Sequence, residues 1–577
     1  MSSAVDRLRF RVAGHTRQGL QVTSFSAVRI YAISLIALTL LGFSLRLYLL
    51  DRFPLREDEA IYSFWALHFW RVDPFFLTVW PDKPPFFIWL LGGIFQLLGP
   101  SQAAARWLNI ALSTITIPVV GATACHLWNR RAALVAATVF SLNPFAISFA
   151  PTAYTDPLLV LASSLALYMA ITSRAFWAGI WLGIAIMTKQ QGVLYVPLVL
   201  GLLLQSQQQS VKDSSPSPIL PGPYARRTIH ILRHLFPTTF LTGLALIILP
   251  ILYWDSLRWA VAPSPWDLGV RNYGALAFVP LVQWLPNLRD WLNLAWYLTA
   301  SWWVWTALIL AALSIPLFYL LFYLLFYLRR HPVILSPSSL QFWRQRRFPS
   351  PVLLLCVWSI AFLALHIVTN IQIWDRYLLP LAPMLALLCG WLVVRWSSHV
   401  PAHWLAIGLV MIGLGMVPAA WKAAAGKLPI GGDHGGYTGL TSALNQVERM
   451  FPDHVTLYHQ TLGWHYQFYL FDQIARGDYE LRWFTNAVYL ADNAVKAPHQ
   501  HRLLIEPLWH PIPHLTSQLR IRGLTLQTVG RFGQFIVYII DEPPQPFCDW
   551  CLCRLPTKWP LVDAGAGSKL QGLSCSP

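Results

Sequence analysis

The chain has 577 residues, of which 56% are hydrophobic and only 12% are charged, and its formal net charge is +17. This composition indicates a membrane protein with many spans. The positive charge does not indicate a nucleic-acid surface, because the basic residues are not gathered on one amphipathic or aromatic-rich element. They lie in loops between apolar segments, which is typical of topology signals.

The N-terminus carries a first topology signal. Residues 1–29 contain five arginines and are followed by an apolar run of about 20 residues without a small-residue cleavage site. We therefore expect a basic cytoplasmic N-terminus followed by a retained membrane span, and no signal peptide.

A requirement of about 20 apolar residues per crossing predicts eleven spans. They are expected near residues 30–50, 106–125, 132–150, 157–173, 175–188, 191–205, 236–254, 304–328, 351–370, 377–395 and 402–420. The apolar stretch 84–98 is too short for a core of about 30 Å at about 1.5 Å per residue, so we expect it to be a helix at the membrane interface. The predicted fold class is an all-α polytopic membrane protein.

The distribution of charge predicts the orientation. With an odd number of spans, most Arg and Lys clusters fall on one side of the membrane, which the positive-inside rule assigns to the cytoplasm. The acidic triplet Glu57-Asp58-Glu59, in the loop 51–105 after the first span, then faces outward. We expect the functional residues and the C-terminal region on this extracytoplasmic side of the cell membrane.

The composition changes after the membrane domain 30–421. Residues 422–545 are more polar and contain short β-rich runs near 454–459, 501–505, 524–529 and 534–540, so we expect a small α/β domain there. The tail 546–577 contains Cys548, Cys551, Cys553 and Cys575, which could pair or bind zinc, but their spacing is not that of a zinc ribbon.

Carboxylates on the predicted outer side have two readings. Glu57, Asp58 and Glu59 precede a helical pattern and could simply cap that helix and complement its positive end. Asp156, before Pro157, could cap the expected span 157–173 in the same way. Because ionisable groups near a bilayer are costly to desolvate, acids from two elements facing one cavity favour a functional site.

Basic residues on the same side suggest an anion site. Lys83 precedes Pro84-Pro85 at the start of a predicted helix, where free amides, the helix dipole and the ammonium group would converge on a phosphate. A lysine that extends its charged end to the lipid interface is the alternative. Arg106, Lys189 and Arg376 could complete the anion site or mark the interface.

These motifs together resemble the GT-C membrane glycosyltransferases. The resemblance covers roughly residues 30–395 and is greatest to the branch of protein O-mannosyltransferases and the bacterial lipid A aminoarabinose transferase. It rests on Asp58-Glu59-Ala60 with Tyr62, Lys83-Pro84-Pro85, Arg106, Thr155-Asp156-Pro157, Thr188-Lys189, and Arg376-Tyr377 with Pro380.

The resemblance implies a transferase that takes a sugar from a polyprenyl-phosphate donor and inverts its anomeric carbon. Asp58 would be the catalytic carboxylate, with Glu59 beside it, and Asp156 would bind acceptor or sugar. The donor phosphate would be held by the basic residues Lys83, Arg106, Lys189 and Arg376. The acceptor could be a protein, a glycan or a lipid, and no nucleotide-binding Gly-rich loop is needed.

Two questions stay open in the sequence. The related aminoarabinose enzyme holds a metal with an acid before the lysine and a later histidine; here Asp82 supplies the acid, but residues 255–290 contain no histidine, so no cofactor is certain. A transporter or lipid flippase is the alternative function. Carriers place ionisable groups near the bilayer midplane, whereas these charges fall at the outer ends of spans, which favours the enzyme.

Overall fold

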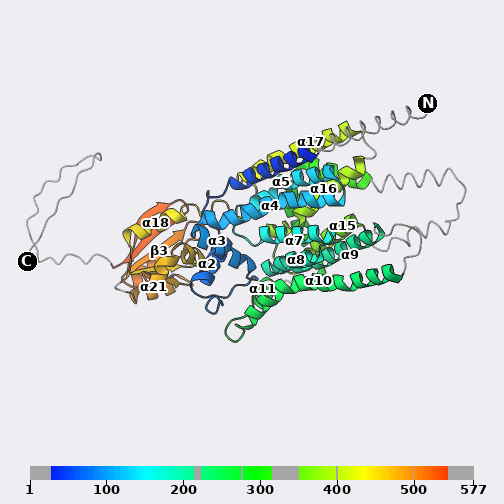
Figure 1. The fold of residues 1–577 in the computed structure, drawn as a ribbon. Coiled ribbons are helices and arrows are strands. Elements are labelled where there is room, and N and C mark those ends of the chain that lie inside the picture. The colour runs from blue at the N-terminus through cyan, green and yellow to red at the C-terminus, as the bar shows by residue number, and fades with distance from the viewer. Residues whose placement is uncertain are drawn as a thin grey trace, which may run out of the picture.

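The computed structural model describes residues 28–213, 223–274, 277–314, 350–397, 401–497 and 500–542. A bundle of long helices forms one end of the molecule, and a sheet with short helices forms the other (Figure 1). Helices α2 (Glu57–Arg71) and α3 (Phe86–Leu98) lie between these two parts. The segment that carries the acidic triplet therefore lies between the bundle and the sheet.

Within the residues that the structure describes, six helical segments are long and apolar enough to cross a membrane. They are Val28–Leu47, Gln102–Leu127 (α4), Thr238–Ser256 (within α10, Pro223–Ser256), Pro351–Val368 (α15), Asp375–Ser397 (η3, Asp375–Leu378, and α16, Leu381–Ser397) and Ala406–Ala424 (within α17, Ala402–Ala424). A seventh crossing is present if Leu281–Leu298 and Trp302–Ser314, which meet at 103°, form one span. The expectation of a multi-pass membrane protein is supported, but the count of eleven is not confirmed.

The remaining expected spans are shorter or interrupted. They are α5 (Arg130–Ser141), α6 (Pro144–Phe149), α7 (Asp156–Ile171), α8 (Ala175–Thr188), η1 (Gln190–Tyr195) and α9 (Val196–Asp213). With 16 and 14 residues, α7 and α8 fall short of a hydrocarbon core of about 30 Å. The expected span 132–150 is divided because Asn143 accepts a hydrogen bond from the Ala146 N–H and Pro144 begins a new helix.

Parts of the sequence prediction lie outside the described residues. These parts are residues 1–27, the second half of the expected span 304–328, and the tail 546–577 with its cysteines. The expected interfacial helix at 84–98 is described as α3, which has 13 residues and is too short to cross a bilayer.

Helices α8 and α10 approach each other closely at glycines. A Cβ atom added to Gly179 would lie 2.2 Å from the carbonyl oxygen of Phe240, and one added to Gly243 would lie 2.1 Å from that of Phe176. Small residues at such crossings allow two helix backbones to pack against each other. The packing of α8 on α10 therefore requires glycine, which has no Cβ atom, at both positions.

The C-terminal part is an α/β unit with a five-stranded sheet of order β2-β1-β3-β5-β4. Its strands are β1 (Val455–His459), β2 (Tyr479–Trp483), β3 (His501–Pro507), β4 (Thr525–Phe532) and β5 (Phe535–Asp541). Strand β1 is parallel to β2 and β3, whereas β5 is antiparallel to β3 and β4. All strands except β2 coincide with runs predicted from the sequence.

Short helices cover both faces of this sheet. They are α18 (Leu440–Met450), α19 (Gly463–Tyr469), α20 (Phe471–Arg476), α21 (Ala487–Val495) and α22 (Leu515–Ile521). One apolar core joins α18 and α19 to the sheet, and a second joins α21 and α22 to it. Because each face buries its own core, the unit has the internal packing of a small domain.

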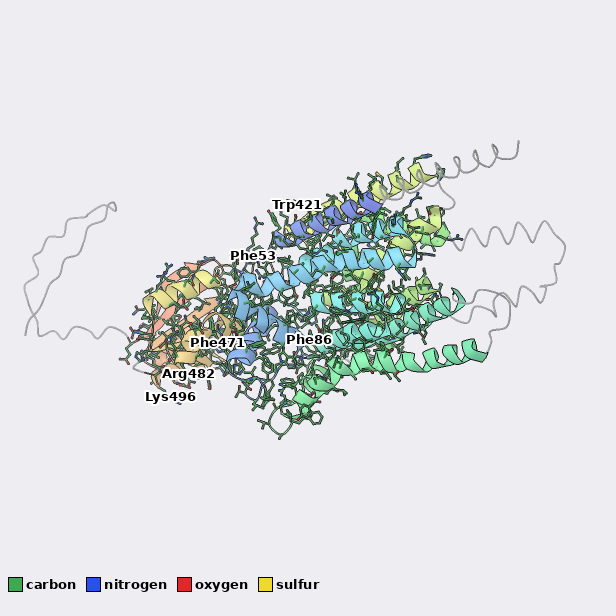
Figure 2. All side chains as sticks on the ribbon, viewed as in Figure 1. Phe53, Phe86, Trp421, Phe471, Arg482 and Lys496 are labelled. Atoms are coloured by element: carbon green, nitrogen blue, oxygen red, sulfur yellow. The ribbon has the colours of Figure 1, made fainter. Side chains whose placement is uncertain are left out.

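The α/β unit is fixed to the backbone that precedes α2. The Leu55 N–H donates to the Tyr469 hydroxyl at 2.9 Å, and the Leu55 carbonyl lies 3.0 Å from Nε2 of the buried His465. The rings of Phe64 and Phe471 pack nearby with centroids 6.3 Å apart, and Phe471 lies at the junction in Figure 2. These contacts set the position at which α2 begins.

The glycine contact between α8 and α10 leads to a stability prediction. Gly179→Ala would force the two backbones apart and should destabilise the protein by about 1–3 kcal/mol, as overpacking does. Gly413→Ala in α17, where a Cβ atom meets nothing within 4 Å, is the matched control and should be neutral or slightly stabilising. Thermal unfolding in detergent measures both, and equal midpoints for the two variants would contradict this role of Gly179.

Candidate active site

A buried ion pair holds the start of α2 against α4. The Glu59 side chain is fully buried, and its carboxylate accepts hydrogen bonds from Arg106 Nε at 3.0 Å and Nη2 at 2.9 Å. It also accepts from the backbone N–H groups of Arg56 and Ala153, each at 3.0 Å. Burial raises the pKa of Glu59, but the two guanidinium groups and these hydrogen bonds more than offset it and lower the pKa to about 2.

Arg106, the second member of this pair, makes further hydrogen bonds to the backbone. The Arg106 guanidinium also donates to the backbone carbonyls of Leu50, Phe53 and Pro54 at 2.8–3.2 Å. All its nitrogens therefore have protein partners. The sequence predicted Glu59 as a catalytic residue and Arg106 as a phosphate ligand, but the structure joins them to each other and to the surrounding backbone.

Asp58, one residue earlier, has a different environment. Its carboxylate lies 2.5 Å from Arg376 Nη1, and its side chain is 33% exposed, whereas the side chain of Arg376 is 6% exposed. The Arg376 guanidinium lies over the ring of Tyr154, with 5.0 Å to the ring centroid, and its Nε atom is buried without a hydrogen-bond partner. Asp58 is thus an accessible carboxylate with a fixed cation beside it.

Lys83 forms a second charged pair with the neighbouring Asp82. The Lys83 ammonium is 3.1 Å from Asp82 Oδ1 and 3.8 Å from the centroid of the Tyr273 ring. Asp82 Oδ2 accepts from Asn272 Nδ2 at 3.0 Å and from the Tyr273 hydroxyl at 2.9 Å. Helix α11 (Pro265–Tyr273), which brings Asn272 and Tyr273, therefore orients Asp82 and covers the lysine.

Asp156 and Lys189 form a third pair, which is almost fully buried. Lys189 Nζ lies 2.6 Å from Asp156 Oδ1 and 4.3 Å from the centroid of the Tyr377 ring. Asp156 begins α7 and Lys189 directly follows α8. The pair connects the ends of two neighbouring helices.

Shared neighbours bring the three pairs together. The Tyr377 ring contacts both Lys189 and Arg376, whose guanidinium carbon lies 5.9 Å from the ring centroid. Gln190, next to Lys189, donates from Nε2 to the Asp82 carbonyl at 2.9 Å. We call the six side chains of these pairs the charged cluster: Asp58, Asp82, Lys83, Asp156, Lys189 and Arg376.

The lysines of the charged cluster have lowered pKa values. Burial lowers the pKa of Lys83; Asp82 opposes this shift, and Arg376 adds to it. Burial likewise lowers the pKa of Lys189 to about 8, against the attraction of Asp156 and with the repulsion of the other two cations. The three cations are therefore close enough to repel one another, and an added anion would relieve that repulsion.

The arrangement around Asp82 can be compared with the metal site considered from the sequence. Within the described ranges, no group of three or more His, Cys, Asp or Glu side chains is placed to hold an ion. Asp82 is the acid that the sequence suggested as a metal ligand. Both of its carboxylate oxygens accept hydrogen bonds, from Lys83, Asn272 and Tyr273. Asp82 is arranged as a partner of the lysine.

Sequence reasoning missed the contribution of α11. Gly269 is the one residue of α11 that could have indicated a close contact: a Cβ atom there would lie 2.3 Å from Gln190 Nε2 and 3.0 Å from the Asp82 carbonyl oxygen. Such a close approach requires glycine, but the sequence does not reveal which segment lies opposite. Asn272 and Tyr273 thus enter the site only through the tertiary fold.

Comparisons with known proteins identify the fold. A family model described as dolichyl-phosphate-mannose-protein mannosyltransferase matches residues 82–222. The structure of ArnT from Cupriavidus metallidurans bound to undecaprenyl phosphate is similar with a TM-score of 0.55 and 17% identity, over 88% of this chain and 98% of that one. The chain has the GT-C fold. The resemblance predicted from the motifs is confirmed.

Further matches complete the comparison. The apo state of the same ArnT gives a TM-score of 0.56 at 16% identity, over 89% of this chain and 98% of that one. The oligosaccharyltransferase AglB from Archaeoglobus fulgidus gives 0.44 at 13% identity, over 88% and 74%. A comparison with curated protein sequences finds no match. Of the charged residues predicted for the site, Asp82, Lys83, Arg106, Asp156 and Lys189 lie inside the segment matched by the family model, whereas Asp58, Glu59 and Arg376 lie outside it.

The Glu59–Arg106 pair gives a prediction for stability. Glu59→Ala leaves the Arg106 charge buried without its partner and should cost about 3–5 kcal/mol of unfolding free energy. Asp472→Ala, which removes an exposed partner of Arg71, is the control and should cost less than about 1 kcal/mol.

The same pair sets a pH dependence. Because the pKa of Glu59 is lower in the folded state, its contribution to stability is complete above the ordinary glutamate range and decreases as the pH falls toward 2. Unfolding midpoints measured between pH 7 and pH 3 should therefore converge for wild type and Glu59→Ala. A gap that stays constant over this range would contradict the assignment.

Proposed function

We propose that this protein is an integral-membrane inverting glycosyltransferase, which transfers a sugar from a polyprenyl-phosphate donor to an acceptor at the extracytoplasmic face of the membrane. The observation that carries this proposal is the convergence of three cations beside one accessible carboxylate, Asp58, in a chain with the GT-C fold. The undecaprenyl phosphate bound to the similar ArnT supports a lipid-phosphate donor.

The cations of the charged cluster suit a donor phosphate. In sugar transfer the bond from the anomeric carbon to the phosphate oxygen breaks, and the phosphate leaves with the electron pair. Fixed positive charge stabilises this developing anion, and burial strengthens the effect because water does not screen it. We assign Lys83, Lys189 and Arg376 to this role.

Asp58 is assigned as the catalytic carboxylate. An acceptor hydroxyl attacks the anomeric carbon from the face opposite the phosphate, and Asp58 takes the hydroxyl proton as the new carbon–oxygen bond forms. A single displacement of this kind inverts the anomeric configuration. The partial exposure of Asp58 supports this assignment, since the other two acids of the charged cluster are more enclosed.

The other predicted site residues receive different roles in the proposal. Glu59 and Arg106 position α2, because their hydrogen-bonding atoms are occupied by each other and by backbone groups. Asp82 and Asp156 orient Lys83 and Lys189 and partly balance their charge. The choice of sugar and of a protein, glycan or lipid acceptor is left to the assay.

Asp58→Asn gives the direct test of this mechanism. The purified protein is supplied with polyprenyl-phosphate sugars, and release of polyprenyl phosphate is measured with a panel of acceptors. Removal of a general base should lower turnover by about 10²–10⁴-fold while membrane insertion stays normal. Glu57→Gln, a neutralised acid on the same helical turn, should retain turnover; equal activity of Asp58→Asn and wild type would remove Asp58 from the reaction.

The lysines give a pH prediction. Below about pH 8 Lys189 carries its charge and can hold the donor phosphate, whereas it loses the charge as the pH rises through this value. We therefore expect kcat/KM for the donor, which reports groups of the free enzyme, to fall above about pH 8. Lys189→Arg keeps the charge and should move this fall to higher pH; an unchanged alkaline limb would exclude Lys189 from donor binding.

A further inference from the structure

The backbone of Gly431 connects the two segments that carry Asp58 and Arg376. Its N–H donates to Asp375 Oδ2 at 2.7 Å, and its carbonyl accepts from Arg56 Nη1. Gly431 lies in the connection between α17 and the C-terminal α/β unit. A residue far from the membrane-domain motifs thus contacts the neighbours of both members of the Asp58–Arg376 pair.

Together with the Asp58–Arg376 ion pair, these contacts form a closed path. Arg56 stands two residues before Asp58, and Asp375 directly precedes Arg376, whose guanidinium is 2.5 Å from the Asp58 carboxylate. Asp375 Oδ1 also accepts from the Arg376 N–H at 2.8 Å, so both of its oxygens are used. We call this closed path the contact ring: Gly431, Arg56, Asp58, Arg376 and Asp375.

We propose that Gly431 is a positioning residue, which holds the Asp58 carboxylate against the Arg376 guanidinium through the contact ring. The proposal rests on the function assigned above to Asp58 and Arg376. Helix α2 and segment η3 are more than 300 residues apart in the sequence, and the ring ties the backbone at their starts to one residue, Gly431. A displacement of about 1 Å between reacting groups can cost about 10²-fold in rate, so such a tie has a large effect.

Only glycine fits at this position. The φ angle of Gly431 is +86°, which side chains rarely permit, and a Cβ atom would lie 2.7 Å from Cβ of Ser148. Ser148 is buried in α6, so it cannot easily move aside. Any side chain must therefore shift the two peptide groups that flank the Gly431 Cα atom, one of which binds Asp375 and the other Arg56.

Three variants test the proposal. Gly431→Ala and Asp375→Ala each break the contact ring and should lower kcat at least about tenfold, with the donor KM changed less than about twofold. Because both act on one ring, the double variant should be no slower than the worse single variant. Gly477→Ala is the matched control: its φ angle of +81° gives the same backbone strain, but a Cβ atom there meets nothing within 4 Å, and kcat should stay within about twofold of wild type.

The outcomes separate this proposal from the function itself. Wild-type kcat in Gly431→Ala, a loss confined to KM, an equal loss in Gly477→Ala, or multiplying losses in the double variant would each overturn the positioning role. If wild type transfers no sugar from any donor, the proposed function fails instead. The contact ring is then tested by thermal unfolding, where the Gly431→Ala and Asp375→Ala shifts should be smaller together than their sum.

Discussion

The fully buried Glu59–Arg106 pair is the interaction on which the rest of the site depends. Through Glu59 it joins the first turn of α2 to α4 and to the backbone at Ala153, which precedes α7. A carboxylate is stable at such depth only because every lone pair has a donor. Asp58 is the next residue in the chain, so the orientation of this pair directs the Asp58 side chain away from the core and toward Arg376.

A second constraint is the balance of charge in the cluster. Three cations and three carboxylates are paired one to one, which keeps enclosed lysines tolerable without a bound anion. Burial lowers the pKa values of Lys83 and Lys189 more than the attraction of their partners raises them, so the charged lysines are not fully stabilised by these pairs. An additional negative charge would stabilise both charged lysines, which is the role proposed above for the donor phosphate.

The sequence predicted which residues carry the charges of the site better than it predicted which residues contact one another. It predicted the charges of the cluster and four of the five C-terminal strands, because these follow from local composition and alternation. It missed β2 (Tyr479–Trp483), and it grouped Glu59 with Asp58 as one acidic motif, although the structure separates an enclosed carboxylate from an accessible one. Tyr273 was also missed. Which segments meet is decided by helix packing, and a short motif contains no information about it.

The position of Gly431 and His465 in the chain has a consequence for biogenesis. Both residues follow α17, the last of the apolar helices described, so the ribosome must finish the membrane-embedded part before either residue emerges. The contacts to Arg56, Asp375 and Leu55 can form only afterwards. A nascent or truncated chain that lacks residues 431 and 465 would thus hold the Asp58–Arg376 pair without these contacts, and the start of α2 would be fixed only after they have emerged.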